Sequence, residues 1–272
     1  MKNKRQMTLP GFKRTLTYTL IYLGLIVILP LTVLIYKGTE LGVSGFTKIL
    51  NDERVLASLW ISFSASLLAT IVNTFFGLIL AWSIVRYEFF GKNLLNTLID
   101  LPLTLPTAVA GISLTAIYSE KGFIGSKLSE FGIKSAYNFN GIVIALIFIG
   151  IPYIVRTIQP VIEELQKEDE EASESLGASN FQTFWYVIFP VILPSLFTGF
   201  GLAFSRALGE YGSVIFISGN LPYQTEIIPL VIITKLEQYQ YNEATAIATI
   251  MLFFSFTILI LLNLIQKRFM RQ

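Results

Sequence analysis

The side chains able to do chemistry fall in one polar loop and in one apolar segment. The chain has no histidine and no cysteine, so it lacks the commonest general base and cannot form a thiolate nucleophile or metal site. What remains is a carboxylate-rich run, Glu163–Glu171, and a charged pair, Arg206 and Glu210, within an apolar stretch. Such groups suit contact with a partner protein or the handling of an anion. They form no recognisable catalytic constellation, so we predict that the chain is not an enzyme and binds no metal or cofactor itself.

The composition places these residues in a membrane protein. Of the 272 residues, 53% are hydrophobic and 14% are charged, and the mean hydropathy is +0.64, far above the range of soluble domains. The net charge of +2 is too small to suggest nucleic-acid binding, so a lipid bilayer is the expected surrounding. We predict an all-α polytopic fold with about six transmembrane helices of roughly 20 residues each. The candidate spans are Thr15–Tyr36, Leu56–Ile84, Leu94–Tyr118, Gly141–Ile158, Val191–Ile217 and Ala244–Ile265.

The distribution of Lys and Arg predicts the orientation. With the N-terminus in the cytoplasm, the cytoplasmic segments carry more Lys and Arg than the external ones, as the positive-inside rule requires. Both ends and the acidic loop are then cytoplasmic. The first apolar run follows a basic arm, as in a signal peptide, but it exceeds the roughly 7–15 residues of a signal-peptide core. We therefore expect an uncleaved first helix.

The polar loop has a recognisable spacing. Glu171-Ala172-Ser173 is followed by three residues and Gly177, and nine residues later by Val187–Pro190. This resembles the cytoplasmic loop of ABC importer permeases, which reads Glu-Ala-Ala, three residues, Gly, nine residues and Ile-x-Leu-Pro. The resemblance implies that residues 159–190, here called the coupling loop, contact an ATPase subunit. A solvated acidic loop without a partner is the alternative.

The residue types in the coupling loop predict two short helices joined at a glycine. Glu163–Leu176 is rich in good helix formers, and Gly177 can adopt the left-handed conformation that ends a helix. Asn180 is a candidate N-cap for a second helix that ends at Phe189. The residues expected to form the ATPase-coupling surface are Glu171, Ala172, Ser173, Leu176, Gly177, Ala178, Phe181 and Pro190.

No segment of the chain matches the phosphate-binding pattern G-x-x-x-x-G-K-[ST]. The only Gly-Lys pair, Gly91-Lys92, is followed by Asn93. ATP and Mg would therefore be used by a separate ATPase chain.

Further motifs extend the resemblance over nearly the whole chain. They include Asp100–Pro102, Leu105–Gly111, Ile151-Pro152, Leu208–Gly212 and Val214–Asn220. In this order they resemble the T-type permease subunits of sulfate/thiosulfate ABC importers, within the family of binding-protein-dependent transport system inner-membrane components. The resemblance implies a type I importer permease (MetI-like) fold. It also implies a second, W-type permease subunit, two ATPase subunits and an external sulfate/thiosulfate-binding protein.

The resemblance leaves the substrate and the membrane open. The first span and its basic arm favour sulfate, because molybdate permeases of this group typically lack both, but molybdate or another oxyanion stays an alternative. An ion-coupled secondary transporter is a second alternative. The coupling loop and the lack of a convincing internal repeat argue against it. The membrane would be a bacterial inner membrane or a plastid membrane.

The expected organisation has three parts. Residues 1–54 would hold the basic arm, the first transmembrane helix and an outer loop. Residues 55–266 would form the importer transmembrane domain, with the coupling loop at 159–190, and 267–272 a basic cytoplasmic tail.

Three charged residues at membrane depth are candidates for the translocation pathway. Arg206 and Glu210 lie four residues apart and share a helical face. Asp100 precedes Pro102 and Pro106, two prolines that would bend its helix. A charge at this depth marks either a functional site or a structural pair, and both interpretations stay open for Arg206 and Glu210.

The segment around Arg206 also carries a face of small residues. Gly201, Ser205, Gly209 and Ser213 follow one another at four-residue spacing. Small residues at this spacing allow two membrane helices to approach closely. We predict that this face packs against another helix, in this chain or in the second permease.

Overall fold

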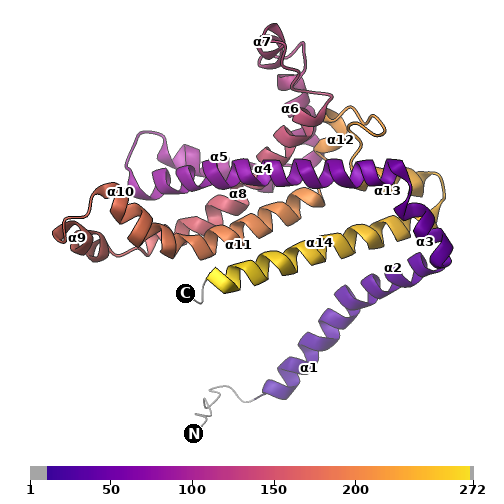
Figure 1. Ribbon diagram of the computed structural model, residues 1–272, viewed down its shortest axis with the longest axis horizontal. Helices are drawn as coiled ribbons and strands as arrows, with labels where there is room; N and C mark the ends of the chain where they lie inside the picture. Colours follow the sequence, from indigo (N-terminus) through magenta and orange to yellow (C-terminus); the bar gives the residue numbers. More distant parts are fainter. Residues whose placement is uncertain (1–10, 270–272) are drawn as a thin grey trace.

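The computed structural model describes residues 11–269, and every regular element in that range is a helix. The all-α expectation is therefore confirmed. The long helices run side by side along one direction, and short helices lie at the ends of the bundle (Figure 1). Residues 1–10 of the basic arm and 270–272 of the basic tail lie outside the described residues. The predicted division at residues 54 and 266 stays a prediction.

Within the described residues, five helical segments are long and apolar enough to cross a membrane, and a bent pair makes a sixth. This agrees with the six expected spans. The segments are α1 (Phe12–Leu23) with the π-helical turn η1 (Gly24–Ile28) and α2 (Leu29–Thr39), α4 (Glu53–Arg86), the bent pair α5 (Lys92–Thr104) and α6 (Thr107–Tyr118), α8 (Phe139–Glu163), α10 (Asn180–Thr183) with the π-helical turn η2 (Phe184–Ile188) and α11 (Phe189–Leu208), and α14 (Tyr241–Phe269).

The fifth span differs from its predicted bounds. It begins at Asn180 and ends at Leu208, so the prediction of Val191–Ile217 is wrong at both ends. The chain turns at Gly212, where a Cβ would lie 2.1 Å from Oγ1 of Thr107. Hydropathy did not show this turn because apolar residues resume directly after it.

Five short helices connect the spans. They are α3 (Gly42–Leu50), α7 (Gly125–Glu130), α9 (Lys167–Ser175), α12 (Val214–Ile217) and α13 (Ile228–Glu237). Of these, α13 packs against α14 and α4. A run this short cannot span a bilayer.

The third span is broken at Pro106. Helices α5 and α6 are bent by 116° at this point, and Pro106 itself has non-helical backbone. Pro102 lies inside α5, so only one of the two prolines makes the break. Beyond it, α6 and α7 stand out sideways from the bundle (Figure 1). Gly111 lets α6 pass close to the chain before α12, since a Cβ there would lie 2.4 Å from the carbonyl oxygen of Ser213.

The core lies where α4, α8 and α11 pack together. Small residues set the distance between these helices: a Cβ on Gly77 would lie 2.6 Å from Cγ2 of Ile154, and one on Gly150 would lie 2.3 Å from Nδ2 of Asn73. Asn73, on α4, donates a hydrogen bond from Nδ2 to the carbonyl oxygen of Ile147 on α8 at 3.1 Å. The close approach therefore brings one interhelical hydrogen bond as well as apolar contact.

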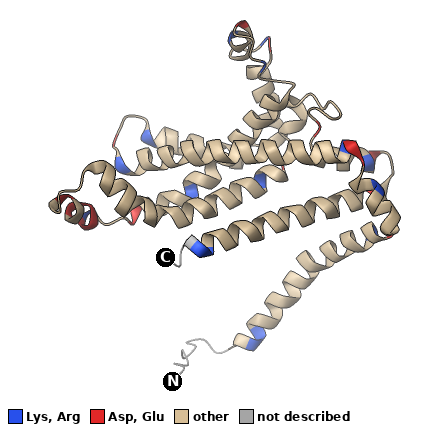
Figure 2. Cartoon of the chain, in the orientation of Figure 1, with Lys and Arg blue, Asp and Glu red and all other residues tan. Residues whose placement is uncertain are grey.

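Helix α14 covers one side of the core and α1 stands free. α14 packs against α2, α13 and α11, and Gln266 donates to the carbonyl oxygen of Pro194 at 3.1 Å. Helix α1 has no buried residue and diverges from the bundle (Figure 1). Acidic side chains concentrate on α9, at one end of the bundle (Figure 2).

Candidate functional site

The coupling loop begins with an acidic helix. Helix α9 carries Glu168, Asp169 and Glu170 in its first turn, where carboxylates interact favourably with the helix dipole. The predicted helix over Glu163–Leu176 is wrong at its start, because α8 continues to Glu163 and the chain is not helical again until Lys167. The packing of α8 explains the difference: Ile162 is still buried, so the core holds α8 helical into the polar run.

The turn after α9 has the predicted glycine and a different cap. Gly177 has φ of 85°, the left-handed conformation that favours glycine. The cap of α10 is Ser179, whose Oγ accepts from the N–H of Gln182 at 3.4 Å, while Oε1 of Gln182 accepts from the N–H of Ser179 at 2.8 Å. The prediction of Asn180 as the N-cap is therefore wrong by one residue, since this reciprocal pair needs a Gln three residues after the cap.

The second helix of the loop does not end at Phe189. It continues through η2 into α11 and reaches Leu208, so the predicted end is wrong. Pro190 lies at the start of α11, just after the wider π-helical turn in which the N–H of Phe189 donates to the carbonyl oxygen of Phe184. A π-helical turn accommodates the missing donor of a proline without stopping the helix. The coupling loop is thus continuous with a transmembrane span.

The turn presents apolar side chains to solvent. Leu176 is 90% exposed and Phe181 is 72% exposed, and Ala178 between them is half-buried. Glu171 and Ala172 are also exposed on α9. Apolar side chains held out on a rigid helix–turn–helix are suited to a groove on a partner protein. This placement agrees with the predicted ATPase-coupling surface, which stays a prediction.

Two links tie α9 to the spans, and neither was expected from the sequence. Arg86, the last residue of α4, donates from Nη2 to Oε1 of Glu170. The hydroxyls of Ser173 and Thr183 lie 2.9 Å apart, joining α9 to α10. Ser173 is the residue that replaces an alanine of the family pattern. This replacement was the one sequence feature that could have pointed to the contact with Thr183.

Arg206 and Glu210 form an ion pair, but not along one helix. Arg206 lies in the last turn of α11, and Glu210 lies beyond its end, which corrects the expectation that both share a span. Nη1 of Arg206 lies 2.6 Å from Oε2 of Glu210, whose side chain is only 2% exposed. Oε1 of Glu210 also accepts from the N–H and the hydroxyl of Ser213, both at 2.9 Å. Glu210 therefore holds the turn after α11 as well as the charge of Arg206.

Asp100 has a partner of its own. Its carboxylate accepts two hydrogen bonds from Arg156 on α8, and Arg156 also donates from Nη1 to Oδ1 of Asn96 at 2.8 Å. The structure does not pair Asp100 with Arg206 or Glu210, so the three pathway candidates separate into two ion pairs. The sequence feature that could have identified Arg156 as the partner of Asp100 is its positive charge within another predicted apolar span.

The predicted small face is not one continuous helical face, because α11 ends at Leu208 and Gly209 and Ser213 lie beyond it. Ser213 is buried against α6, whereas Gly201 and Gly209 have no close neighbour on another described element. A Cβ on Gly201 would meet no atom within 4 Å, and one on Gly209, just after the end of α11, would meet only the carbonyl oxygen of Ser205. The close contact of α11 is instead at Gly199, where a Cβ would lie 3.3 Å from Cα of Ile154 on α8. Packing of the small face against the second permease stays a prediction.

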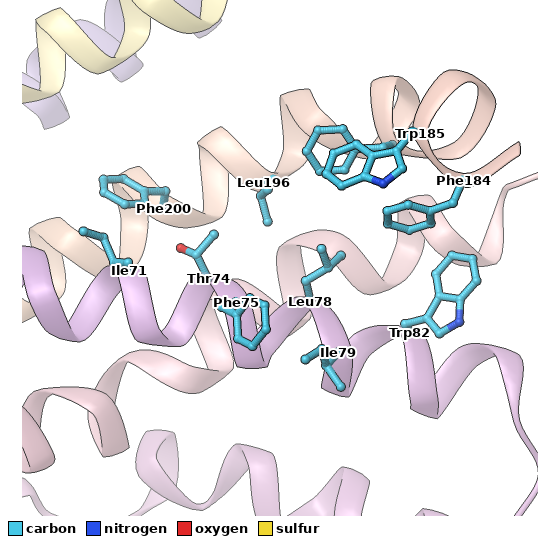
Figure 3. Close-up of a pocket in the computed structure, with 11 residues that line it drawn as sticks. Ile71, Thr74, Phe75, Leu78, Ile79, Trp82, Phe184, Trp185, Leu196 and Phe200 are labelled. Carbon is cyan, nitrogen blue, oxygen red and sulfur yellow. The ribbon is translucent and has the colours of Figure 1, made fainter. Parts of the chain in front are cut away.

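A groove of about 670 Å³ runs between α4 and the η2–α11 segment (Figure 3). Trp82 and Phe184 lie at one end of it, with ring centroids 5.9 Å apart. Its lining is almost wholly apolar, which suits hydrocarbon and not an oxyanion. The lining residues are Ile71, Thr74, Phe75, Leu78, Ile79, Trp82, Phe184, Trp185, Phe189, Leu196 and Phe200.

The arrangement of spans around a helix–turn–helix loop is that of an ABC importer permease. A chain of the bacterial alginate ABC transporter, solved with an alginate pentasaccharide-bound periplasmic protein, superposes with a TM-score of 0.77 at 16% identity, covering 94% of each chain. A chain of the MetNI methionine ABC transporter in inward-facing conformations matches with a TM-score of 0.53 at 16% identity, over 80% of this chain and 93% of that one. The MetI-like permease fold is confirmed.

The chain belongs to the family of binding-protein-dependent transport system inner membrane components, whose profile matches residues 73–272. It is a multi-pass transport subunit without a catalytic domain. A probable sulfate transport system permease protein of Nephroselmis olivacea is 45% identical over 248 residues, 91% of this chain and 87% of the relative. The sulfate transport system permease protein CysT of Escherichia coli (strain K12) is 42% identical over 264 residues, 97% of this chain and 95% of the relative.

Proposed function

We propose that this chain is one permease subunit of an ATP-driven importer of sulfate or thiosulfate. The observation that carries the proposal is the rigid turn at Gly177, which holds Leu176 and Phe181 out to solvent. The turn is continuous with a transmembrane span through η2. A partner that binds this turn can therefore move α11 directly.

The proposed complex contains a second permease subunit of the W type, two ATPase subunits and an external sulfate/thiosulfate-binding protein. ATP and Mg bind the ATPase subunits, and this chain binds no cofactor. The family description supports an external binding protein, and the names of the relatives support a sulfate transport system. The cited relatives, named for sulfate transport, favour sulfate over molybdate.

The charges of the described spans suit transient passage of a dianion. Arg206 and Asp100 are each paired with an opposite charge, and their side chains are 32% and 41% exposed. A paired, half-exposed arginine can attract an anion without binding it tightly, because its positive charge is partly compensated. We assign Arg206 to the translocation pathway on this basis, with Glu210 and Asp100 as the carboxylates that partly compensate the charges of Arg206 and Arg156 there.

The test is uptake of labelled sulfate by vesicles that contain the full complex and the binding protein. We expect sulfate uptake to require ATP on the side of the membrane where the ATPase subunits lie. We also expect that excess molybdate does not inhibit this uptake. Uptake that ignores ATP and follows an ion gradient would overturn the proposal in favour of a secondary transporter. ATP-dependent uptake that molybdate competes would reassign the substrate and keep the importer.

A further inference from the structure

Helix α9 has an inner face that the coupling surface does not use. Glu170 and Ser173 lie three residues apart and are half-buried against the spans, whereas Glu171 and Leu176 are exposed. Residues three apart in a helix share a face. One face of α9 is thus available to a partner while the other is attached to this chain.

Each residue of the inner face contacts a different element. Glu170 accepts from Arg86 at the end of α4, and Ser173 shares a hydrogen bond with Thr183 of α10. α10 continues into α11, so the Ser173 link only reinforces a covalent connection. Arg86 and Glu170 are 84 positions apart in the sequence. The link between α4 and α9 must therefore be made by side chains.

The Arg86 side chain is held in place from both sides. Its guanidinium carbon lies 5.1 Å from the centre of the Trp82 ring, a cation–π distance. Its Nε is buried without a hydrogen-bond partner among the described residues, so Glu170 and the Trp82 ring are what hold the guanidinium. The side chains of Arg86 and Glu170 are 18% and 27% exposed, which shields the pair from solvent screening.

These contacts close into a ring. Glu170 contacts Arg86, and Arg86 lies over the Trp82 ring. The rings of Trp82 and Phe184 in turn form a T-shaped contact (Figure 3). Phe184 follows Thr183, which returns to α9 through Ser173. A closed ring resists deformation better than a single contact, because moving α9 must also displace α4 or break the ion pair.

We propose that Arg86 is a positioning residue for the coupling loop, whose ion pair with Glu170 makes α4 move together with α9. This inference rests on the proposed function, since it assumes that an ATPase subunit moves α9. The reason is connectivity: α8 and α11 are joined to the loop by the backbone, whereas α4, which packs against both of them, is tied to α9 itself through this ion pair. Without it α4 would follow α9 only indirectly, through its packing on α8 and α11 and the contact of Trp82 with Phe184.

The first test measures coupling in the reconstituted complex. We expect Arg86→Gln and Glu170→Gln each to lower the number of sulfate ions transported per ATP hydrolysed by about fivefold or more, the scale of a typical coupling energy. The exchange Arg86→Glu with Glu170→Arg should restore part of the ratio, because it keeps the ion pair and loses the cation–π contact with Trp82. Lys92→Gln is the matched control, because it removes a charge from the ion pair with Glu88, which does not involve α9. An unchanged ratio in both single variants would overturn the inference.

The second test needs no transport. The chain has no native cysteine, so spin labels at Tyr87→Cys and Glu174→Cys, in a complex whose partner subunits carry no cysteine, report only the distance from the end of α4 to α9. We expect one narrow distance distribution in the wild-type background and a broader one with Arg86→Gln. If the wild-type complex does not import sulfate, the proposed function fails while this distance still tests the role of Arg86. A narrow distribution in the variant would show that α9 is held without the ion pair.

Discussion

The guanidinium of Arg156 on α8 binds the carboxylate of Asp100 on α5 through two hydrogen bonds, Nε to Oδ1 at 2.8 Å and Nη2 to Oδ2 at 2.6 Å. These residues are 56 positions apart in sequence. The pair joins the half of the broken third span that precedes Pro106 to the most buried helix of the core. It therefore fixes α5 on one side of a bend of 116°.

Breaking this pair should loosen α5 more than the core. Both side chains are about one third exposed, 31% for Arg156 and 41% for Asp100, so solvent screens the interaction. We expect a double-mutant cycle with Asp100→Asn and Arg156→Gln to give a coupling free energy of about 1 kcal/mol. Thermal unfolding of the purified chain in detergent measures it, and a coupling energy near zero would show that the pair contributes nothing to holding α5.

The Arg206–Glu210 pair allows structural and transport roles to be separated. Arg206→Gln leaves the buried Glu210 carboxylate without its cation, which should destabilise the chain by about 3 kcal/mol. Adding Glu210→Gln removes the unpaired charge and should restore most of the stability. Uptake by the restored double variant then measures the pathway role alone. We expect it to fall well below wild type, and normal uptake would make the pair purely structural.

A large side chain should have different effects at two glycines of α11: at one it should lower the stability of the chain, and at the other it should impair assembly of the complex. Gly199→Leu would press on Ile154 and Thr157 of α8, and such overpacking should cost about 2 kcal/mol of stability in the chain itself. Gly201→Leu meets no atom of this chain within 4 Å, so the isolated chain should stay stable while the complex with the second permease assembles poorly. Melting temperature and co-purification measure the two effects. Wild-type complex yield from Gly201→Leu would remove the small face from the interface.

Leu176 should decide whether an ATPase subunit binds. Its side chain is 90% exposed, so Leu176→Glu disturbs nothing inside the chain, but it would place a charge in the partner's groove. Burying an unpaired charge costs several kcal/mol, and we expect the variant to lose co-purification with the ATPase. The matched control is Phe131→Glu, at another exposed residue, 80% accessible and beyond α7. Equal ATPase recovery in both variants would mean that the turn at Gly177 is not the docking surface.

Local sequence features predicted the spans and the turn well and the loop boundaries less well. Among the described residues five of the six apolar runs became candidate spans and the sixth became the bent pair α5–α6, and Gly177 took the left-handed backbone expected of it. The errors at Glu163, Phe189 and Ile217 arose where packing outweighed local residue preference. At Ile162 and through Pro190 a helix continues because its other face is packed. The apolar run that reaches Ile217 is interrupted after Leu208, and at Gly212 the chain passes so close to Thr107 that a side chain would not fit.

The sequence by itself determined that this is a polytopic membrane protein with a helix–turn–helix loop, because hydropathy and glycine conformation act over a few residues. Only the tertiary structure decided which charges meet. Arg86 with Glu170 and Arg156 with Asp100 are 84 and 56 positions apart, and no local pattern specifies such partners. They are brought together by the packing of α4, α5 and α8 around small residues, and that packing is a property of the whole bundle.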